Sequence, residues 1–252
     1  MALANIKNLM AEMKFRGMLY QVDSLLDQAT KESWSYSDLL DALMQAELDW
    51  KKEKRVEAKI RTSKLKLKPE LEDFDFTAKR SITQKQIKEL YSLKWIKQGR
   101  PILLIGQTGV GKTFLAQALG LHACRSNYSV LFNDLTTFIE NLSMARSSNS
   151  YLKFKERMAS PALLILDDFG LRKFTTTEAQ DLCEIIEARS IEKATIITTQ
   201  LPLDHWCEVI PDPVIADAII DRVIHSSITI NIKGDSYRKV KAQKLDKQEV
   251  IQ

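Results

Sequence analysis

The residues GQTGVGKT at positions 106–113 combine glycines with a lysine–threonine pair, at a spacing suited to binding phosphate groups. Glycines in such a loop adopt backbone angles closed to other residues, so that N–H groups converge on phosphate oxygens beside the N-terminal end of a following helix. Lys112 would supply a charge to the β- and γ-phosphates, and the Thr113 hydroxyl would bind Mg²⁺. The loop predicts a nucleotide site contacted by Gly106, Gln107, Thr108, Gly109, Val110, Gly111, Lys112, Thr113 and Phe114.

The alternative interpretation of this loop is a glycine-rich turn with an incidental lysine. Its flanks argue against that alternative. The apolar run Pro101–Ile105 precedes the loop and predicts a strand, and Phe114, Leu115 and Ala118 follow it at helical spacing. A phosphate-binding loop is expected between a strand and a helix in this order.

Two adjacent carboxylates, Asp167 and Asp168, follow a second apolar run at Ala162–Leu166. At the end of a buried strand, Asp167 is suited to hold Mg²⁺ through water. Asp168 is suited to orient or deprotonate the water that attacks the γ-phosphate. An Asp-Asp turn after a buried strand is the structural alternative, but the position downstream of a phosphate loop favours the catalytic interpretation.

Two further polar residues have both a functional and a structural interpretation. Gln200 ends the apolar run Ala194–Thr199 and is placed to bring its amide beside the γ-phosphate, unless it is an ordinary loop glutamine. Arg222 is expected within a helix, where it either pairs with a local acid such as Asp217 or Asp221 or reaches the nucleotide of a neighbouring subunit. Residue types alone leave both questions open.

The elements that must position these side chains alternate between strands and helices. Apolar runs predict strands at 101–105, 129–132, 162–166 and 194–199, and helical spacing predicts helices after the phosphate loop and over 134–145 and 175–190. This alternation predicts an α/β fold with a parallel sheet covered on both faces. Ligand-binding groups gather at the C-terminal ends of such strands, where the loop, the carboxylates and Gln200 would meet.

The first 68 residues predict a small all-helical domain, and residues 69–252 the nucleotide-binding domain. Helical spacing over 3–29 is interrupted at Gly17, where a kink or a break is expected. A second helix is expected from an N-cap at Ser37 to about residue 60. The charge within this region is uneven: residues 1–50 carry a net −4, whereas residues 51–68 carry nine Lys or Arg against two Glu, a net +7.

This basic segment is either a solvated helix face or a contact surface for a polyanion. Nine cations in eighteen residues repel one another unless a polyanion screens them, and nucleic acid is the commonest such partner. The candidate DNA contacts are Lys51, Lys52, Lys54, Arg55 and Lys59, four of which fall near one face of a helix. A calmodulin-like or membrane-surface role is the less favoured alternative, because the segment has few bulky apolar residues.

Composition excludes several other classes of protein. No stretch reaches the apolar length that a membrane span needs, and the N-terminal residues, which include Glu12 at helical spacing, do not predict a signal peptide. The three cysteines are scattered and form no metal-binding spacing, which favours a reducing compartment. We therefore expect a cytoplasmic protein with no membrane partner.

With these motifs in hand, the chain resembles the AAA+ ATPases of the initiator and helicase-loader branch. More closely it is similar to the IstB-type transposition helper ATPases, with the DnaC/DnaI helicase loaders as cousins. The motifs GQTGVGKT, LLILDDFG, TIITTQLP, DPVIADAIIDRVIH and GDSYR occur in family order between residues 70 and 250. The resemblance implies a three-layer αβα P-loop fold, ATP and Mg²⁺ as cofactors, assembly as a homo-oligomer on duplex DNA, and a cognate transposase as partner.

The resemblance also assigns roles to single residues. It makes 106–113 the Walker A loop and Asp167–Asp168 the Walker B pair, and it places Gln200 at sensor 1, Arg222 at the arginine finger and Arg238 at sensor 2. Initiator-type members insert an extra DNA-facing helix in the region of Arg146, Lys153, Lys155 and Arg157.

The sequence departs from the family pattern at three places. Asp168 replaces the commoner glutamate, so the base is one methylene shorter and slow hydrolysis is expected. Gln200 replaces the commoner asparagine. The chain ends soon after Arg238, which predicts a fold without a full C-terminal lid. A DnaC-like replicative helicase loader is the alternative function. A small-molecule phosphotransferase is less favoured, because no lid or acceptor pocket is evident.

Overall fold

The computed structural model describes residues 2–70, 81–224 and 227–234 of the 252-residue chain. Contacts within the chain divide it into two units, Met1–Ala58 and Lys59–Gln252. Each unit has a core of its own. Within the described residues, no helix is both long enough and apolar enough to cross a bilayer.

The first unit consists of α1 (Ala2–Glu12), α2 (Arg16–Lys31) and most of α3 (Tyr36–Thr62). Its core is small and centres on Met18, Val22 and Leu43. Helices α2 and α3 approach closely at Gly17, where a β-carbon would lie 2.5 Å from the carbonyl oxygen of Ala46. The interruption expected at Gly17 is therefore a break between α1 and α2, which lies just before this residue. Glycine at position 17 allows α2 to approach α3 closely.

The start of α3 differs from the expectation by two residues. The Ser35 hydroxyl accepts a hydrogen bond from the Asp38 N–H (3.2 Å), and the Asp38 carboxylate accepts one from the Ser35 N–H (3.0 Å). This reciprocal capping sets the helix start at Tyr36 rather than after Ser37.

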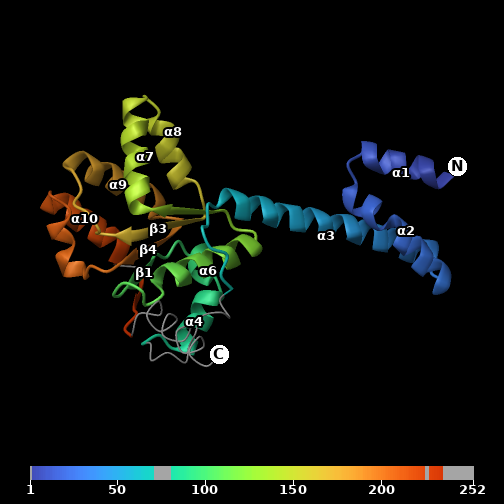
Figure 1. Cartoon of the computed structure of the whole chain (residues 1–252), viewed down its shortest axis with the longest axis horizontal. Coiled ribbons are helices and arrows are strands. Elements are labelled where there is room, and N and C mark those ends of the chain that lie inside the picture. The colour runs from blue at the N-terminus through green and yellow to red at the C-terminus, as the bar shows by residue number, and fades with distance from the viewer. Residues whose placement is uncertain (1, 71–80, 225–226, 235–252) are drawn as a thin grey trace, which may run out of the picture. The chain divides into compact units, whose positions relative to one another are not determined.

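The second unit contains a five-stranded, all-parallel sheet with the order β2-β3-β4-β1-β5 (Figure 1). The strands are β1 (Ile102–Ile105), β2 (Val130–Asp134), β3 (Leu163–Phe169), β4 (Ala194–Thr199) and β5 (Ile228–Asn231). Alternate side chains of β1 enter different cores: Ile102 and Leu104 enter one, and Leu103 the other. The sheet therefore separates two cores, as the predicted three-layer αβα fold requires.

Helices cover both faces of this sheet. One core is closed by α4 (Gln84–Tyr91), α5 (Lys94–Lys97) and α6 (Lys112–Arg125). The other core is closed by α7 (Leu135–Ser147), α8 (Tyr151–Ala159), α9 (Thr176–Arg189), the 3₁₀ helix η2 (Leu203–Glu208) and α10 (Pro213–Ile224). Figure 1 shows α4 and α6 on the opposite side of the strands from α7 and α10.

The four predicted strands are all present, but β5 was not predicted. It has only four residues, lies at the edge of the sheet, and buries Ile230 alone, so its sequence lacks a continuous apolar run. Before β1, α4 and α5 are separate helices, because Leu93 between them has a left-handed φ of 52°.

Residues 59–70, most of which the sequence assigns to the N-terminal domain, belong to the second unit and contact β2 and α6. The Phe132 N–H on edge strand β2 donates to the Ser63 carbonyl oxygen (2.7 Å), and the Leu67 N–H donates to Gln117 Oε1 on α6 (2.7 Å). Leu65 lies against the core beneath α6. The boundary in the contacts thus falls at Ala58, ten residues before the predicted one at 68.

Candidate active site

The glycine-rich loop leaves the C-terminal end of β1 and leads directly into α6. Gly109 and Gly111 have φ angles of 85° and 102°, in the left-handed region that favours glycine. At Gly106 a β-carbon would lie 2.3 Å from the carbonyl oxygen of Ile232, so a side chain has no room there. The loop therefore presents bare backbone at the C-terminal edge of the sheet, the arrangement that phosphate binding needs.

Lys112, the first residue of α6, lies over this loop. Its side chain is almost fully buried, and its Nζ donates to the carbonyl oxygens of Gly106 (2.8 Å) and Gln107 (3.0 Å). Burial lowers the pKa of Lys112, while the negative charges of Asp168 and Asp167 act in the opposite direction. A phosphate in the loop would supply the ammonium with a further counter-charge.

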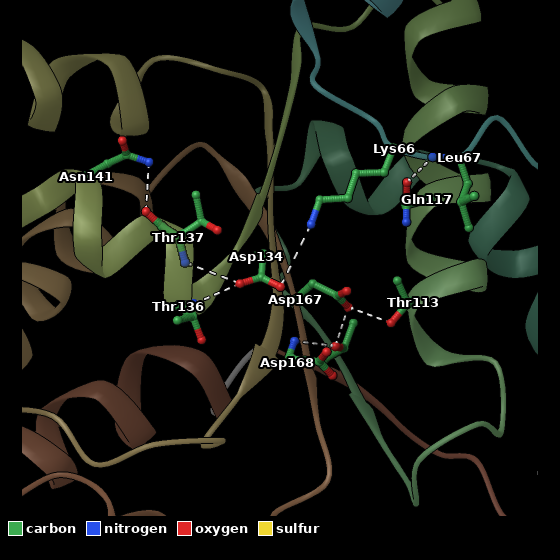
Figure 2. A network of polar contacts seen from close by, with 11 residues as sticks. Lys66, Leu67, Thr113, Gln117, Asp134, Thr136, Thr137, Asn141, Asp167 and Asp168 are labelled. Atoms are coloured by element: carbon green, nitrogen blue, oxygen red, sulfur yellow. Dashed lines mark hydrogen bonds and ion pairs between the residues drawn. The ribbon is translucent and has the colours of Figure 1, made fainter.

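Asp167 lies directly beside the start of α6. Its Oδ1 accepts hydrogen bonds from the hydroxyls of Thr113 (3.0 Å) and Thr198 (2.6 Å), and Figure 2 shows Thr113 and Asp167 facing each other. Burial raises the pKa of Asp167, and the charges of Asp168 and Asp134 add to that rise, whereas the two hydroxyl donors oppose it. A carboxylate and a hydroxyl so placed are oxygen donors of the type that Mg²⁺ takes in addition to phosphate oxygens.

Asp168 is held in an uncommon backbone conformation. Its φ is 61°, and the pairing of β3 with β4 is irregular between Leu166 and Phe169. The Asp168 N–H donates to the Thr198 hydroxyl (2.9 Å), the same hydroxyl that donates to Asp167. This irregularity interrupts the strand alternation at the two aspartates, and both carboxylates lie near enough to Lys112 to act on its pKa.

Thr198 is a site residue that the sequence analysis missed. It is fully buried and bridges Asp167 to the Asp168 backbone, yet it lies within the apolar strand β4, where threonine is ordinary. The available signal was the pair Thr198–Thr199 at the C-terminal end of that strand, facing the end of the strand that carries the carboxylates.

Asp134 adds a third carboxylate to the same edge. It ends β2, where it pairs in register with Asp167, and its Oδ1 caps α7 through the N–H groups of Thr136 (3.1 Å) and Thr137 (3.3 Å). Lys66 approaches its Oδ2 at 4.0 Å (Figure 2).

Gln200 follows β4 and contacts the phosphate loop directly. Its Oε1 accepts a hydrogen bond of 2.6 Å from the Thr108 hydroxyl. The structure thus brings together the loop, Thr113, the two aspartates and Gln200, which the sequence analysis placed in one site.

Arg222 lies elsewhere. It is in the last turn of α10, and the chain then enters β5 at Ile228, which pairs with the first residue of β1, Ile102. The phosphate loop follows the last residue of β1, so Arg222 lies toward the opposite edge of the sheet. Its guanidinium pairs with Glu187 of α9 at 3.2 Å, an acid outside the two that the sequence suggested.

The candidate DNA contacts fall into two groups. In the first unit, Lys51, Lys52, Lys54 and Arg55 are all exposed on α3, where Lys51 pairs with Glu47 (3.2 Å) and Lys54 with Glu57 (2.7 Å). Lys59 is less exposed and is bonded to Asn127 through the backbone carbonyl and the side-chain Oδ1.

In the second unit, the basic residues near α8 are engaged to different degrees. Arg146 pairs through two nitrogens with Asp181, whose side chain is only 1% exposed, and Lys155 pairs with Glu184 (2.6 Å). Lys153 and Arg157 are exposed and line a cavity of about 300 Å³ between α7 and α8. Arg238, the last predicted site residue, lies outside the described residues.

Comparison with known proteins places these features in a family. The sequence model of the IstB-like ATP binding proteins matches residues 8–245. An insertion sequence ATP-binding protein of Sinorhizobium fredii, y4pL, is 34% identical over 92% of this chain and 95% of its own length. The ATP-binding protein of insertion sequence IS21 from Pseudomonas aeruginosa is 34% identical over 91% of this chain and 87% of its own.

Solved structures agree with the fold. The crystal structure of DnaI superposes with a TM-score of 0.56 over 66% of this chain and 91% of that one, at 19% identity. DnaA from Aquifex aeolicus bound to AMPPCP gives a TM-score of 0.57 over 73% of this chain and 56% of that one, at 22% identity. These similarities support the fold, a parallel sheet covered by helices on both faces.

Proposed function

The chain belongs to the IstB-like ATP-binding protein family and is an AAA+ ATPase, and on that premise we propose that it assists a transposase. In this proposal the protein assembles as a homo-oligomer on duplex DNA and hydrolyses ATP at sites shared between neighbouring subunits. The relatives named for insertion sequences support the association with transposition.

The residues at the C-terminal edge of the sheet would bind and hydrolyse ATP. Gly106–Phe114 would cradle the phosphates, with Lys112 as the counter-charge to the β- and γ-phosphates. Thr113 and Asp167 would hold Mg²⁺, which when bound neutralises charge on the phosphates. Asp168 would orient or deprotonate the attacking water, and Gln200 would place its amide near the γ-phosphate.

The single observation that carries shared sites is the position of Arg222. Because it lies toward the sheet edge opposite the phosphate loop, it is poorly placed to act on the nucleotide bound by its own chain. A partly exposed arginine in this place is suited to the nucleotide of a neighbour, where its planar guanidinium would stabilise the charge of the transferring phosphoryl group. Arg238 stays our proposal for sensor 2.

Duplex DNA is the proposed polyanion for the exposed cations. Lys52, Lys54 and Arg55 on α3, with Lys51, would contact phosphates largely independently of base sequence, and Lys153 and Arg157 would add to that contact. Most of these cations would exchange a present partner for phosphate, namely Lys51, Lys52, Lys54, Lys59, Arg146 and Lys155.

A charge-reversal pair tests the DNA contact. We expect Lys52→Glu/Arg55→Glu to weaken binding to a nonspecific duplex and to reduce the slope of log affinity against log salt by about two. The matched control is Lys85→Glu/Lys88→Glu, which reverses two exposed lysines on α4. An unchanged slope in the first variant, or an equal loss in the control, would contradict DNA contact at α3.

The experiment that tests the proposed function as a whole measures ATP turnover and particle mass together, with and without duplex DNA. We expect DNA and ATP to drive the chain into large particles that hydrolyse ATP faster. A chain that stays monomeric and indifferent to DNA would contradict the proposal.

The alternative function, loading of a replicative helicase, makes a different prediction about the partner. A pull-down against the cognate transposase and a hexameric helicase separates the two, and we expect retention of the transposase alone.

The cytoplasm is the proposed compartment, because all three cysteines are free.

A further inference from the structure

The Arg222 side chain is folded back along its own helix. One terminal nitrogen donates to the carbonyl oxygen of Ala218, four residues earlier (2.9 Å), and the other donates to Glu187 Oε1 on α9 (3.2 Å). The Arg222 side chain is 29% exposed and that of Glu187 61%, so the pair lies at the surface. Any contact of this guanidinium with another subunit requires that the pair open first.

Glu187 is one of a row of acids on α9. Asp181, Glu184 and Glu187 follow at intervals of three residues and thus share one side of the helix. Each pairs with a cation from a different helix or helix end, respectively Arg146, Lys155 and Arg222.

Exposure distinguishes Glu187 from the other members of the row. The side chain of Asp181 is 1% exposed and holds Arg146 through two hydrogen bonds, which makes that pair part of the packing of α7 on α9. Glu187 is the most exposed of the three and makes a single bond to its partner. An exposed ion pair of this type is weak and easily exchanged for a stronger anion.

We propose that Glu187 is a positioning residue that holds Arg222 within its own subunit until a neighbouring nucleotide replaces it. This inference rests on the proposed role of Arg222 in shared sites. A triphosphate carries more negative charge than one carboxylate. When subunits assemble, the neighbour's nucleotide therefore replaces Glu187 as the partner of the Arg222 guanidinium. Assembly must break the Arg222–Glu187 pair, so the free energy of that pair makes ATP-dependent assembly less favourable.

Glu187→Gln removes the charge and keeps the size of the side chain. Because exposed pairs are weak, we expect the protein concentration at half-maximal ATP-dependent assembly to fall about 1.5- to 5-fold. The KM for ATP and the turnover of the fully assembled protein should stay at wild-type values. Particle mass at a series of protein concentrations, with saturating ATP and duplex DNA, gives the midpoint.

Two controls isolate the pair from general effects of charge. Glu192→Gln neutralises another exposed acid beyond the end of α9 and should leave the midpoint unchanged. In the Arg222→Ala background, Glu187→Gln should leave the assembly midpoint unchanged, because Glu187 acts through Arg222 and that side chain has been removed. Glu187→Asp, which restores the charge, should return the midpoint toward wild type.

The outcomes separate this inference from the proposed function. If Arg222→Ala hydrolyses ATP like wild type, the shared site itself is wrong. If Arg222→Ala is impaired but Glu187→Gln leaves the midpoint unchanged or raises it, Glu187 does not hold Arg222 back. A shift that persists in the Arg222→Ala background would also overturn the inference, because Glu187 would then act by another route.

Discussion

At the scale of single residues, the Asp167 carboxylate is a buried charge that the site retains. It is 4% exposed, its pKa is raised by burial and by two neighbouring carboxylates, and two hydroxyls are its hydrogen-bond donors. A charge held in this way destabilises the fold in the absence of a bound cation, and sites that act on phosphate commonly retain such groups.

The sign of this effect follows from the raised pKa. The free energy of unfolding falls as the pH rises from the ordinary pKa of an aspartate to the raised pKa of folded Asp167, and the full loss is present above that raised pKa. Asp167→Asn keeps the acceptor oxygen and removes the charge. We expect it to raise Tm at pH 8 in EDTA by about 2–4 °C, with a smaller difference near the ordinary pKa of an aspartate, at about pH 4. An Asn variant of equal or lower Tm at pH 8 would contradict this account.

Thr198 positions both aspartates through one hydroxyl. Thr198→Val preserves shape but leaves the Asp168 N–H without its acceptor and Asp167 with Thr113 as its one hydroxyl donor. We expect turnover to fall about 10- to 100-fold, as for other supporting residues of metal sites, with ATP affinity retained. Thr229→Val on β5, an exposed threonine, is the control. Wild-type turnover in Thr198→Val would contradict a role of Thr198 in positioning the two aspartates.

At the scale of elements, Arg189 joins the ends of three segments. Its buried guanidinium donates to the carbonyl oxygens of Met158 and Ala159 at the end of α8, of Pro161 before β3, and of Ala194 at the start of β4. It also donates to the Thr195 hydroxyl. These bonds fix the N-terminal edge of the sheet against α8 and α9.

Removing that guanidinium should destabilise the fold rather than the chemistry. Arg189→Met leaves several buried carbonyl groups without a donor, and we expect the free energy of unfolding to fall by about 2–4 kcal/mol. Urea unfolding measures the loss, with the exposed Arg157→Met as the control. A change within about 0.5 kcal/mol, as for an ordinary surface substitution, would show that these carbonyl groups do not depend on Arg189.

The sequence predicted those elements whose signals are local. The phosphate loop needs glycines at defined spacing, and β3 and β4 are continuous apolar runs, so both could be read directly. Edge strand β5 buries too little to show such a run, and the capping of α3 depends on which of two serines meets Asp38.

Residues that act through distant partners escaped sequence reasoning. Thr198 gains its role from an irregularity in the pairing of β3 with β4, and Glu187 from the packing of α9 against α10. Neither residue type is unusual at its position; the pair Thr198–Thr199 was a signal for the first, and no local pattern marks the second. The end of the basic segment could not be predicted either, because Lys59 bonds to Asn127 after the end of α6 and the residues that follow contact α6 and β2.

At the scale of the whole molecule, one chain carries two separated parts of the proposed catalytic site. The phosphate loop, Asp167 and Asp168 lie at the C-terminal edge of the sheet, and Arg222 lies toward the opposite edge. In the proposed assembly, the phosphate-loop edge of one subunit meets Arg222 of the next. Such a contact is head-to-tail, and it builds a ring or a helical filament rather than a two-fold dimer.

Mixing two variants that each hydrolyse ATP slowly tests this shared site most directly. Arg222→Ala keeps the loop and both aspartates, whereas Asp168→Asn keeps Arg222. In a mixed assembly, the first variant supplies a complete nucleotide pocket and the second supplies the arginine. We predict that each variant alone hydrolyses ATP slowly, and that an equal mixture regains turnover at about one quarter of the sites. A mixture no faster than the average of its components, although mixed particles form, would contradict catalysis between subunits.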